Sequence, residues 1–94
     1  MIKYSVVVPI YNRPKELAEL LESLTLQEFK DFEVIIIEDG SNISSEQIAK
    51  KFESLLKLQY FSKPNEGQGF GRNYGVKYAS GEYLIFFDSD VIVP

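Results

Sequence analysis

The sequence predicts an α/β fold in which a mostly parallel sheet carries helices on both faces. Short apolar segments rich in β-branched residues alternate along the chain with segments whose apolar residues recur every three or four positions. The order is β-α-β-α-β-α-β, and such alternation is typical of a parallel sheet covered by helices. The 94 residues are enough for a single domain or part of one, so we treat residues 1–94 as one unit.

The first half of the chain contains two expected strands and one expected helix. Residues 5–10 (Ser-Val-Val-Val-Pro-Ile) and 32–37 (Phe-Glu-Val-Ile-Ile-Ile) lack alternation, as expected for strands that are buried on both faces. Pro14 is well placed as the first residue of a helix. Four leucines follow at helical spacing and predict its buried side: Leu17, Leu20, Leu21 and Leu24.

The second half repeats the alternation after a turn at residues 39–42. Ser44 and Gln47 form a capping-box pattern at the start of a second helix. The apolar side of that helix is expected to contain Ile48, Phe52 and Leu55. A short strand at residues 58–61 and a glycine-rich loop at 64–71 come next. A third helix is expected from Phe70, Tyr74 and Tyr78, with Gly81 as its stop, before a last strand at residues 82–87.

The composition excludes several classes of function. The chain has no Cys and no His, which removes disulfides, thiolate nucleophiles, imidazole bases and the usual zinc sites. Any metal must then be held by oxygen, which favours Mg²⁺, Mn²⁺ or Ca²⁺. The net charge is −4 with no basic tract, so we expect no nucleic-acid partner. We identify no signal peptide and no apolar run long enough to span a bilayer. We expect a cytoplasmic protein, or one held at the cytoplasmic face of the membrane through segments outside this sequence.

Polar residues are concentrated where the expected strands end. Tyr11-Asn12, Glu38-Asp39-Gly40 and Asp88-Ser89-Asp90 leave the first, second and last strands. In open parallel sheets, ligands bind outside the carboxyl ends of the strands, at the point where the strand order reverses. Carboxylates that crowd there repel one another unless a cation or a polar ligand lies among them. The sequence therefore predicts a ligand site at this edge.

Each of these residues also has a purely structural interpretation. Asp88 and Asp90 fit a divalent-cation site, or an acidic loop that ends a strand. Asp39 before a glycine fits a ligand contact or an ordinary turn, and Tyr11 fits packing as well as stacking on a base. The loop around Arg72 matches neither the dinucleotide fingerprint nor the Walker loop. Arg72 itself could pair with phosphate or make a surface salt bridge.

Four motifs in one order nevertheless resemble a known family. They are residues 5–12, 31–41 (with Glu38-Asp39-Gly40-Ser41), 71–75 (Gly-Arg-Asn-Tyr-Gly) and 81–90 (ending in Asp88-Ser89-Asp90). Together they resemble the N-terminal half of a family 2 glycosyltransferase, and the resemblance covers essentially the whole chain. It implies the Rossmann-like half of a GT-A domain that binds a nucleotide-diphosphate sugar, most often UDP-linked.

The resemblance also implies roles for individual residues. Pro9 and Tyr11 would border the nucleoside, Asp39 would hydrogen-bond the uracil, and Arg72 would lie near the base and phosphates. Glu38, next to Asp39, would belong to the same nucleotide-sugar site. Asp88 would face the ribose or the sugar. Asp90, with Asp88 beside it, would hold a Mn²⁺ or Mg²⁺ ion that bridges the diphosphate. Such an ion stabilises the charge on the leaving diphosphate during an inverting transfer.

The chain departs from the family pattern in two places. Glu38 stands where the family often has Asp, and the family's general base lies further along the chain than Pro94. We therefore expect a segment that binds donor but transfers nothing by itself, with the glycan or lipid-linked acceptor bound by a missing half. The last strand should expose apolar surface and favour self-association.

Two other classes of protein share features with this sequence. A non-catalytic nucleotide-binding or interaction module would share every visible feature. A haloacid-dehalogenase-type phosphatase places its paired aspartates after the first strand, which here ends in Pro9-Ile10-Tyr11-Asn12, so it is set aside.

Overall fold

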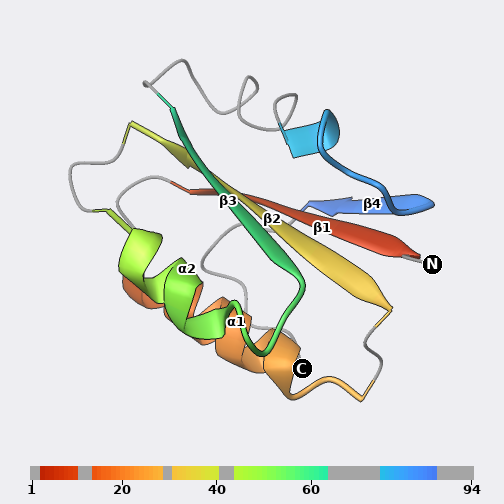
Figure 1. Cartoon of the computed structure of the whole chain (residues 1–94), viewed down its shortest axis with the longest axis horizontal. Helices are drawn as coiled ribbons and strands as arrows, with labels where there is room; N and C mark the ends of the chain where they lie inside the picture. Colours follow the sequence, from red (N-terminus) through yellow and green to blue (C-terminus); the bar gives the residue numbers. More distant parts are fainter. Residues whose placement is uncertain (1–2, 11–13, 29–30, 41–43, 64–74, 87–94) are drawn as a thin grey trace.

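The computed structural model describes residues 3–10, 14–28, 31–40, 44–63 and 75–86. In chain order they form β1 (Tyr4–Ile10), α1 (Pro14–Thr25), β2 (Phe32–Asp39), α2 (Glu46–Phe52), β3 (Leu58–Lys63) and β4 (Tyr83–Phe86). Figure 1 shows the sheet running diagonally, with both helices beside it. In the part of the chain that the structure describes, the helices are too short and too polar to cross a membrane.

The described strands form one parallel sheet in the order β3-β2-β1-β4. Val6 of β1 lies between Val34 of β2 and Ile85 of β4, and Val34 in turn pairs with Leu58 of β3. The chain moves outward from β1 to β2 to β3 and then returns to the other side of β1. This order confirms the predicted parallel α/β fold and places the reversal of strand order between β1 and β4.

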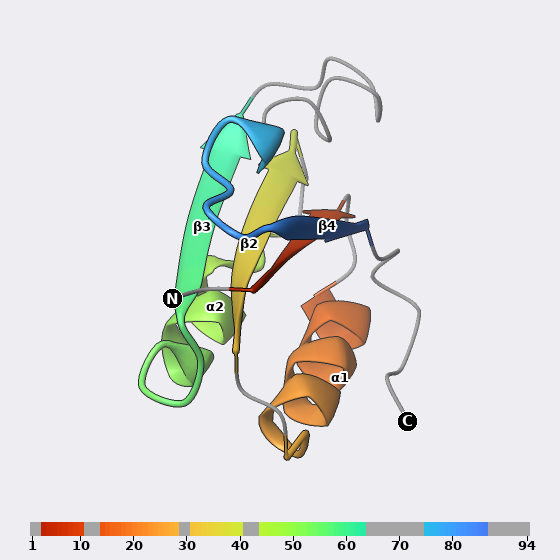
Figure 2. The ribbon, with the colours of Figure 1, turned by 90° about the vertical axis from the view of Figure 1, so that its right-hand side faces the viewer.

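Helices α1 and α2 lie on the same face of the sheet (Figure 2). The core between them and the sheet uses residues of even number from the central strands, such as Val6, Val8, Val34 and Ile36, because side chains alternate across a strand. The α1 leucines that the sequence predicted as its buried side, Leu17, Leu20, Leu21 and Leu24, all lie in this core.

The opposite face carries the segment that the sequence predicted as the end of a third helix. Residues 75–76 are helical, and the amides of Tyr78 and Ala79 donate to the carbonyls of Gly75 and Val76 at 3.1 and 3.2 Å. A Cβ atom on Gly75 would lie 2.5 Å from Cγ1 of Val7 and 3.4 Å from Cγ1 of Ile37, so this turn packs directly on the sheet. The earlier part of the predicted helix lies outside the described residues.

Two predictions about α2 were wrong. Ser45, not Ser44, is its N-cap, so the hydroxyl of Ser44 lies one residue too early for a capping box and accepts from the amide of Glu46 at 3.2 Å. The helix also ends at Phe52, so the chain turns before Leu55, which is 62% exposed. Leu56 enters the core in its place.

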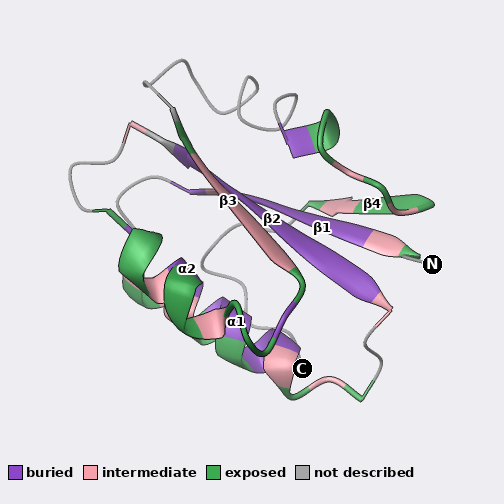
Figure 3. Cartoon of the chain, viewed as in Figure 1, coloured by how far each residue is buried: buried purple, intermediate pink, exposed green. Residues whose placement is uncertain are grey.

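Strand β4 is the most exposed of the described strands (Figure 3). Tyr83, Leu84 and Phe86 are 55%, 43% and 40% exposed, whereas the central strands β1 and β2 are largely buried. The apolar surface that the sequence predicted on this strand is therefore present at Leu84 and Phe86.

Candidate functional site

The carboxyl ends of the parallel strands meet at one edge of the sheet. Ile10, the last residue of β1, pairs with Glu38 of β2, and Glu38 pairs with Ser62 of β3. Strand β4 runs parallel to β1 on its other side, so its carboxyl end points toward the same edge. The candidate site lies there, where the strand order reverses between β1 and β4.

The predicted ligand residues are described to different degrees. Pro9 pairs with Ile37 and is half-buried one residue before the end of β1, and the backbone of Asp39 forms the last position of β2. Tyr11, Arg72, Asp88 and Asp90 lie outside the described residues. Their roles therefore stay predictions.

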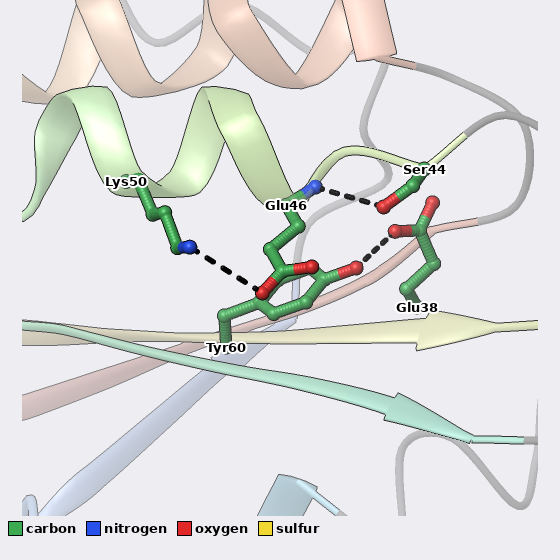
Figure 4. A network of polar contacts seen from close by, with 5 residues as sticks. All are labelled: Glu38, Ser44, Glu46, Lys50 and Tyr60. Atoms are coloured by element: carbon green, nitrogen blue, oxygen red, sulfur yellow. Dashed lines mark hydrogen bonds and ion pairs between the residues drawn. The ribbon is translucent and has the colours of Figure 1, made fainter.

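Glu38 has turned into the interior, beneath the start of α2 (Figure 4). It is 1% exposed, and its Oε1 atom accepts a hydrogen bond from the amide of Ser45 at 2.8 Å. The hydroxyl of Tyr60 donates to the same oxygen. Within the described ranges, Glu38 Oε2 and the Ser45 hydroxyl are buried without a hydrogen-bond partner. The sequence predicts Glu38 among the residues that bind the nucleotide sugar, and the contacts that the structure describes for its carboxyl group are with Ser45 and Tyr60.

Sequence reasoning missed the contribution of Tyr60, because the sequence indicates only that it belongs to the short strand at residues 58–61. It lies on β3 opposite Ile36, so its ring lies diagonally next to Glu38 on the helix-covered face. Burial, and then the hydrogen bond to Glu38, raise the pKa of Tyr60 to about 12. The hydroxyl thus keeps its proton at neutral pH and remains a donor to Glu38.

A shallow hollow of about 210 Å³ opens between α2 and β3, next to Tyr60. The exposed ion pair between Lys50 and Glu46 lies on its rim, with a separation of 3.8 Å, and pairs of this kind contribute little to stability. The hollow lies at the β3 side of the sheet, away from the reversal between β1 and β4. We therefore do not assign the nucleotide to it.

A second buried carboxyl, Glu33, lies on the opposite face, near the amino ends of the strands. Its Oε2 atom accepts hydrogen bonds from the Ser5 hydroxyl at 2.6 Å and from the amide and hydroxyl of Ser80 at 2.7 and 2.9 Å. The amide of Gly81 donates to the Ser5 hydroxyl at 2.8 Å. This network attaches the segment that precedes β4 to both central strands.

The hydrogen bonds also decide the charge of Glu33. Burial by itself would raise the pKa of Glu33, but the hydrogen bonds from Ser5 and Ser80 outweigh it, and the pKa is lowered from 4.5. Glu33 is therefore ionised at neutral pH. It holds β4 in place but lies far from the carboxyl edge, so we regard it as part of the scaffold.

The described residues contain no cluster of three acidic side chains that could hold a metal ion. Asp88 and Asp90, which the sequence predicts as metal ligands, lie outside these residues. Mn²⁺ or Mg²⁺ binding thus stays a prediction.

Comparison with known proteins gives one consistent result. Residues 5–94 match glycosyl transferase family 2. An uncharacterized glycosyltransferase from Rickettsia felis is 41% identical over 88 residues, which are 94% of this chain and 15% of that protein. The poly(ribitol-phosphate) beta-N-acetylglucosaminyltransferase TarS of Staphylococcus aureus is 40% identical over 94 residues, or 96% of this chain and 16% of TarS.

The structural comparison agrees. A crystal structure of S. aureus TarS 1–349 superimposes with a TM-score of 0.91 at 40% identity, covering 97% of this chain and 28% of that one. TarS 1–349 in complex with UDP-GlcNAc gives a TM-score of 0.89 at 41% identity, covering 95% of this chain and 27% of that one. The match spans only a small share of these longer proteins. It extends along nearly the whole of this chain, which therefore belongs to glycosyl transferase family 2.

Proposed function

We propose that this chain is the donor-binding segment of an inverting glycosyltransferase that uses a UDP-linked sugar. The observation that carries the proposal is the sheet order, which places the ends of β1, β2 and β4 at one edge around a strand reversal. The sequence motifs predicted to bind the donor follow these same strand ends. The likeness to TarS 1–349, which was crystallised with UDP and with UDP-GlcNAc, supports the choice of nucleotide.

Each residue has one role in this proposal. Pro9 and Tyr11 border the nucleoside, Asp39 accepts a hydrogen bond from the uracil, and Arg72 neutralises charge near the phosphates. Asp88 faces the ribose or the sugar.

Asp90, with Asp88 beside it, holds a Mn²⁺ or Mg²⁺ ion, whose ligands in proteins are carboxylates and phosphate oxygens. The bound ion would stabilise the negative charge that develops on the leaving diphosphate.

The acceptor and the general base belong, in this proposal, to parts of the enzyme that the segment does not include. The segment corresponds to about one sixth of TarS in length, and a glycan or lipid-linked acceptor would be bound elsewhere. We therefore expect the 94-residue segment to bind donor without transferring sugar.

Calorimetry with UDP, in the presence and absence of Mn²⁺, tests the proposal. We expect binding that strengthens when Mn²⁺ is added, and we expect Asp90→Asn to remove that strengthening. Asp31→Asn is the matched control, because it makes the same chemical change just before β2, at the amino edge of the sheet. A folded sample that binds no UDP with Mn²⁺ present would refute the proposal. UDP binding by a full-length protein that transfers no sugar to any acceptor would favour a non-catalytic module.

A further inference from the structure

The loop between β2 and α2 is closed at its base by a buried side chain. Glu38 is the last residue but one of β2, and Ser45 is the N-cap of α2. The 2.8 Å hydrogen bond from the Ser45 amide to Glu38 Oε1 joins the two ends of this loop. Gly40 supplies the sharp turn that starts the loop, since its φ of 67° lies in the left-handed region that favours glycine.

A third element fixes the same oxygen. The hydroxyl of Tyr60, which comes from β3, also donates to Glu38 Oε1. One carboxyl oxygen is thus held by donors from α2 and β3 while its own backbone belongs to β2. Hydrogen bonds to a carboxyl group that is itself buried are stronger than the same bonds in water, because the accepting oxygen is shielded from solvent.

The position of Glu38 also explains why it should act indirectly. It is 1% exposed and lies on the face that α1 and α2 cover, so bound nucleotide at the open edge would not reach its carboxyl group. The next residue is Asp39, which ends β2 and is predicted to accept a hydrogen bond from the uracil. Any shift of the loop at Glu38 or Ser45 would therefore move Asp39.

We infer that Glu38 and Tyr60 are positioning residues that hold the β2–α2 loop, and with it Asp39, in the geometry that recognises the base of the nucleotide. This inference rests on the proposed function, because it gives the anchored loop a role in binding UDP. It assigns different roles to the two residues. Glu38 orients the loop from the buried, helix-covered face of the sheet, and Asp39 contacts the ligand.

The test compares two buried glutamates in the 94-residue chain. Glu38→Gln weakens both hydrogen bonds to Glu38 Oε1, and Tyr60→Phe removes one of them. Glu33→Gln is the matched control. Glu33 is also buried and also accepts hydrogen bonds from a hydroxyl and an amide, but at the amino end of the sheet. Affinities for UDP and CDP are measured by calorimetry. Cytosine lacks the N3 proton of uracil, so the ratio of the two affinities reports the base contact.

We expect Glu38→Gln and Tyr60→Phe to lower the UDP-to-CDP ratio about three- to tenfold, the effect of misplacing one hydrogen bond. Glu33→Gln should leave the ratio unchanged even where it lowers the melting temperature as much. A ratio that changes equally in Glu33→Gln and Glu38→Gln would overturn the inference, because loss of stability would then explain it. If Glu38→Gln fails to fold, Tyr60→Phe still decides, since it keeps the carboxyl group.

Amide hydrogen exchange without nucleotide gives a second reading. Both Glu38→Gln and Tyr60→Phe should speed exchange of the Ser45 amide, and Glu33→Gln should instead speed exchange at Ser80 and Gly81. An unchanged exchange rate of the Ser45 amide in both Glu38→Gln and Tyr60→Phe would also overturn the inference. A parent chain that binds no UDP refutes the proposed function, whereas the exchange measurement then still decides whether Glu38 and Tyr60 hold the loop.

Discussion

Replacing Glu33 by Gln tests how strongly β4 is attached to the rest of the sheet. The substitution keeps the size and shape of the side chain but removes its charge. In the native chain, Glu33 Oε2 accepts three hydrogen bonds, from the Ser5 hydroxyl and from the amide and hydroxyl of Ser80. A neutral amide oxygen at the same place would accept weaker hydrogen bonds from the same donors.

The expected magnitude follows from the difference between charged and neutral hydrogen bonds. A hydrogen bond to a charged group contributes about 1.5–3 kcal/mol and a neutral one about 0.5–1.5 kcal/mol, so three bonds together lose roughly 3 kcal/mol. The cost of burying a charge disappears in the variant and offsets part of this loss. We expect a net loss of about 1–2 kcal/mol in the free energy of unfolding at neutral pH. For a domain of this size the melting temperature should fall by about 4–16 °C.

The lowered pKa of Glu33 also predicts how its contribution to stability changes with pH. Because the pKa of Glu33 is lowered from 4.5 in the folded chain, its ionised form stabilises the fold above about that pH, and the contribution is lost as pH falls through the folded pKa. Gln does not titrate. The difference in the free energy of unfolding between the parent and Glu33→Gln should therefore narrow as the pH is lowered from neutral to below 4.5.

Urea denaturation followed by circular dichroism at several pH values measures this gap. Glu53→Gln, an exposed change of the same kind, is the control and should shift stability little at any pH. The reasoning would be refuted if Glu33→Gln lost less than about 0.5 kcal/mol at neutral pH, which is the usual effect of a surface change. It would also be refuted by a gap that widened on acidification.

Further predictions concern close packing and the β4 surface. Gly75→Ala should lower the free energy of unfolding by about 1–3 kcal/mol, because its Cβ would lie 2.5 Å from a side-chain atom of Val7. Adding Val7→Ala should relieve part of that loss in a double-mutant cycle. Gly81→Ala should lower the free energy of unfolding further, because its Cβ would lie 2.7 Å from backbone atoms of Tyr4 and Ser5, and Val7→Ala should not relieve this loss. Light scattering should detect self-association that rises with concentration and is reduced by Leu84→Lys, which places a charge on an exposed edge strand. A monodisperse monomer at high concentration would contradict this last expectation.

The elements that the sequence predicted well are those whose signals are local. The apolar run at residues 5–10 became β1 (Tyr4–Ile10), and the expected start of a helix at Pro14 is the first residue of α1. In both segments, neighbours in the sequence carry the whole pattern, whether an unbroken apolar run or leucines at helical spacing. The exact ends of α2 were missed, since the choice between Leu55 and Leu56 as the buried residue depends on how the chain turns into β3.

The two buried glutamates could not be predicted in the same way. The partners of Glu33 are 28 and 47 positions away in the chain, and no local pattern connects them. Glu38 was grouped with Asp39 because both stand at the end of a strand. Successive side chains point to opposite faces, so neighbours at a strand end need not share a role. The burial of Glu38 beneath α2 distinguishes the two residues.

The topology explains why these glutamates lie where they do. Crossovers between parallel strands are right-handed, so the two crossovers that lead outward from β1 to β2 to β3 place α1 and α2 on one face. The return to the far side of β1 brings the described end of the next connection, residues 75–82, to the opposite face, where Gly75 packs on Val7. Glu38, of even number, anchors the connection from β2 to α2, and Glu33, of odd number, anchors the segment that enters β4. The two strands that flank β1, and from which the predicted donor ligands continue, are thus each held by one buried carboxyl group. If these strand ends bind the donor as proposed, the two carboxyl groups keep them in a fixed relation on both sides of the strand reversal, as recognition of an extended donor across that point requires.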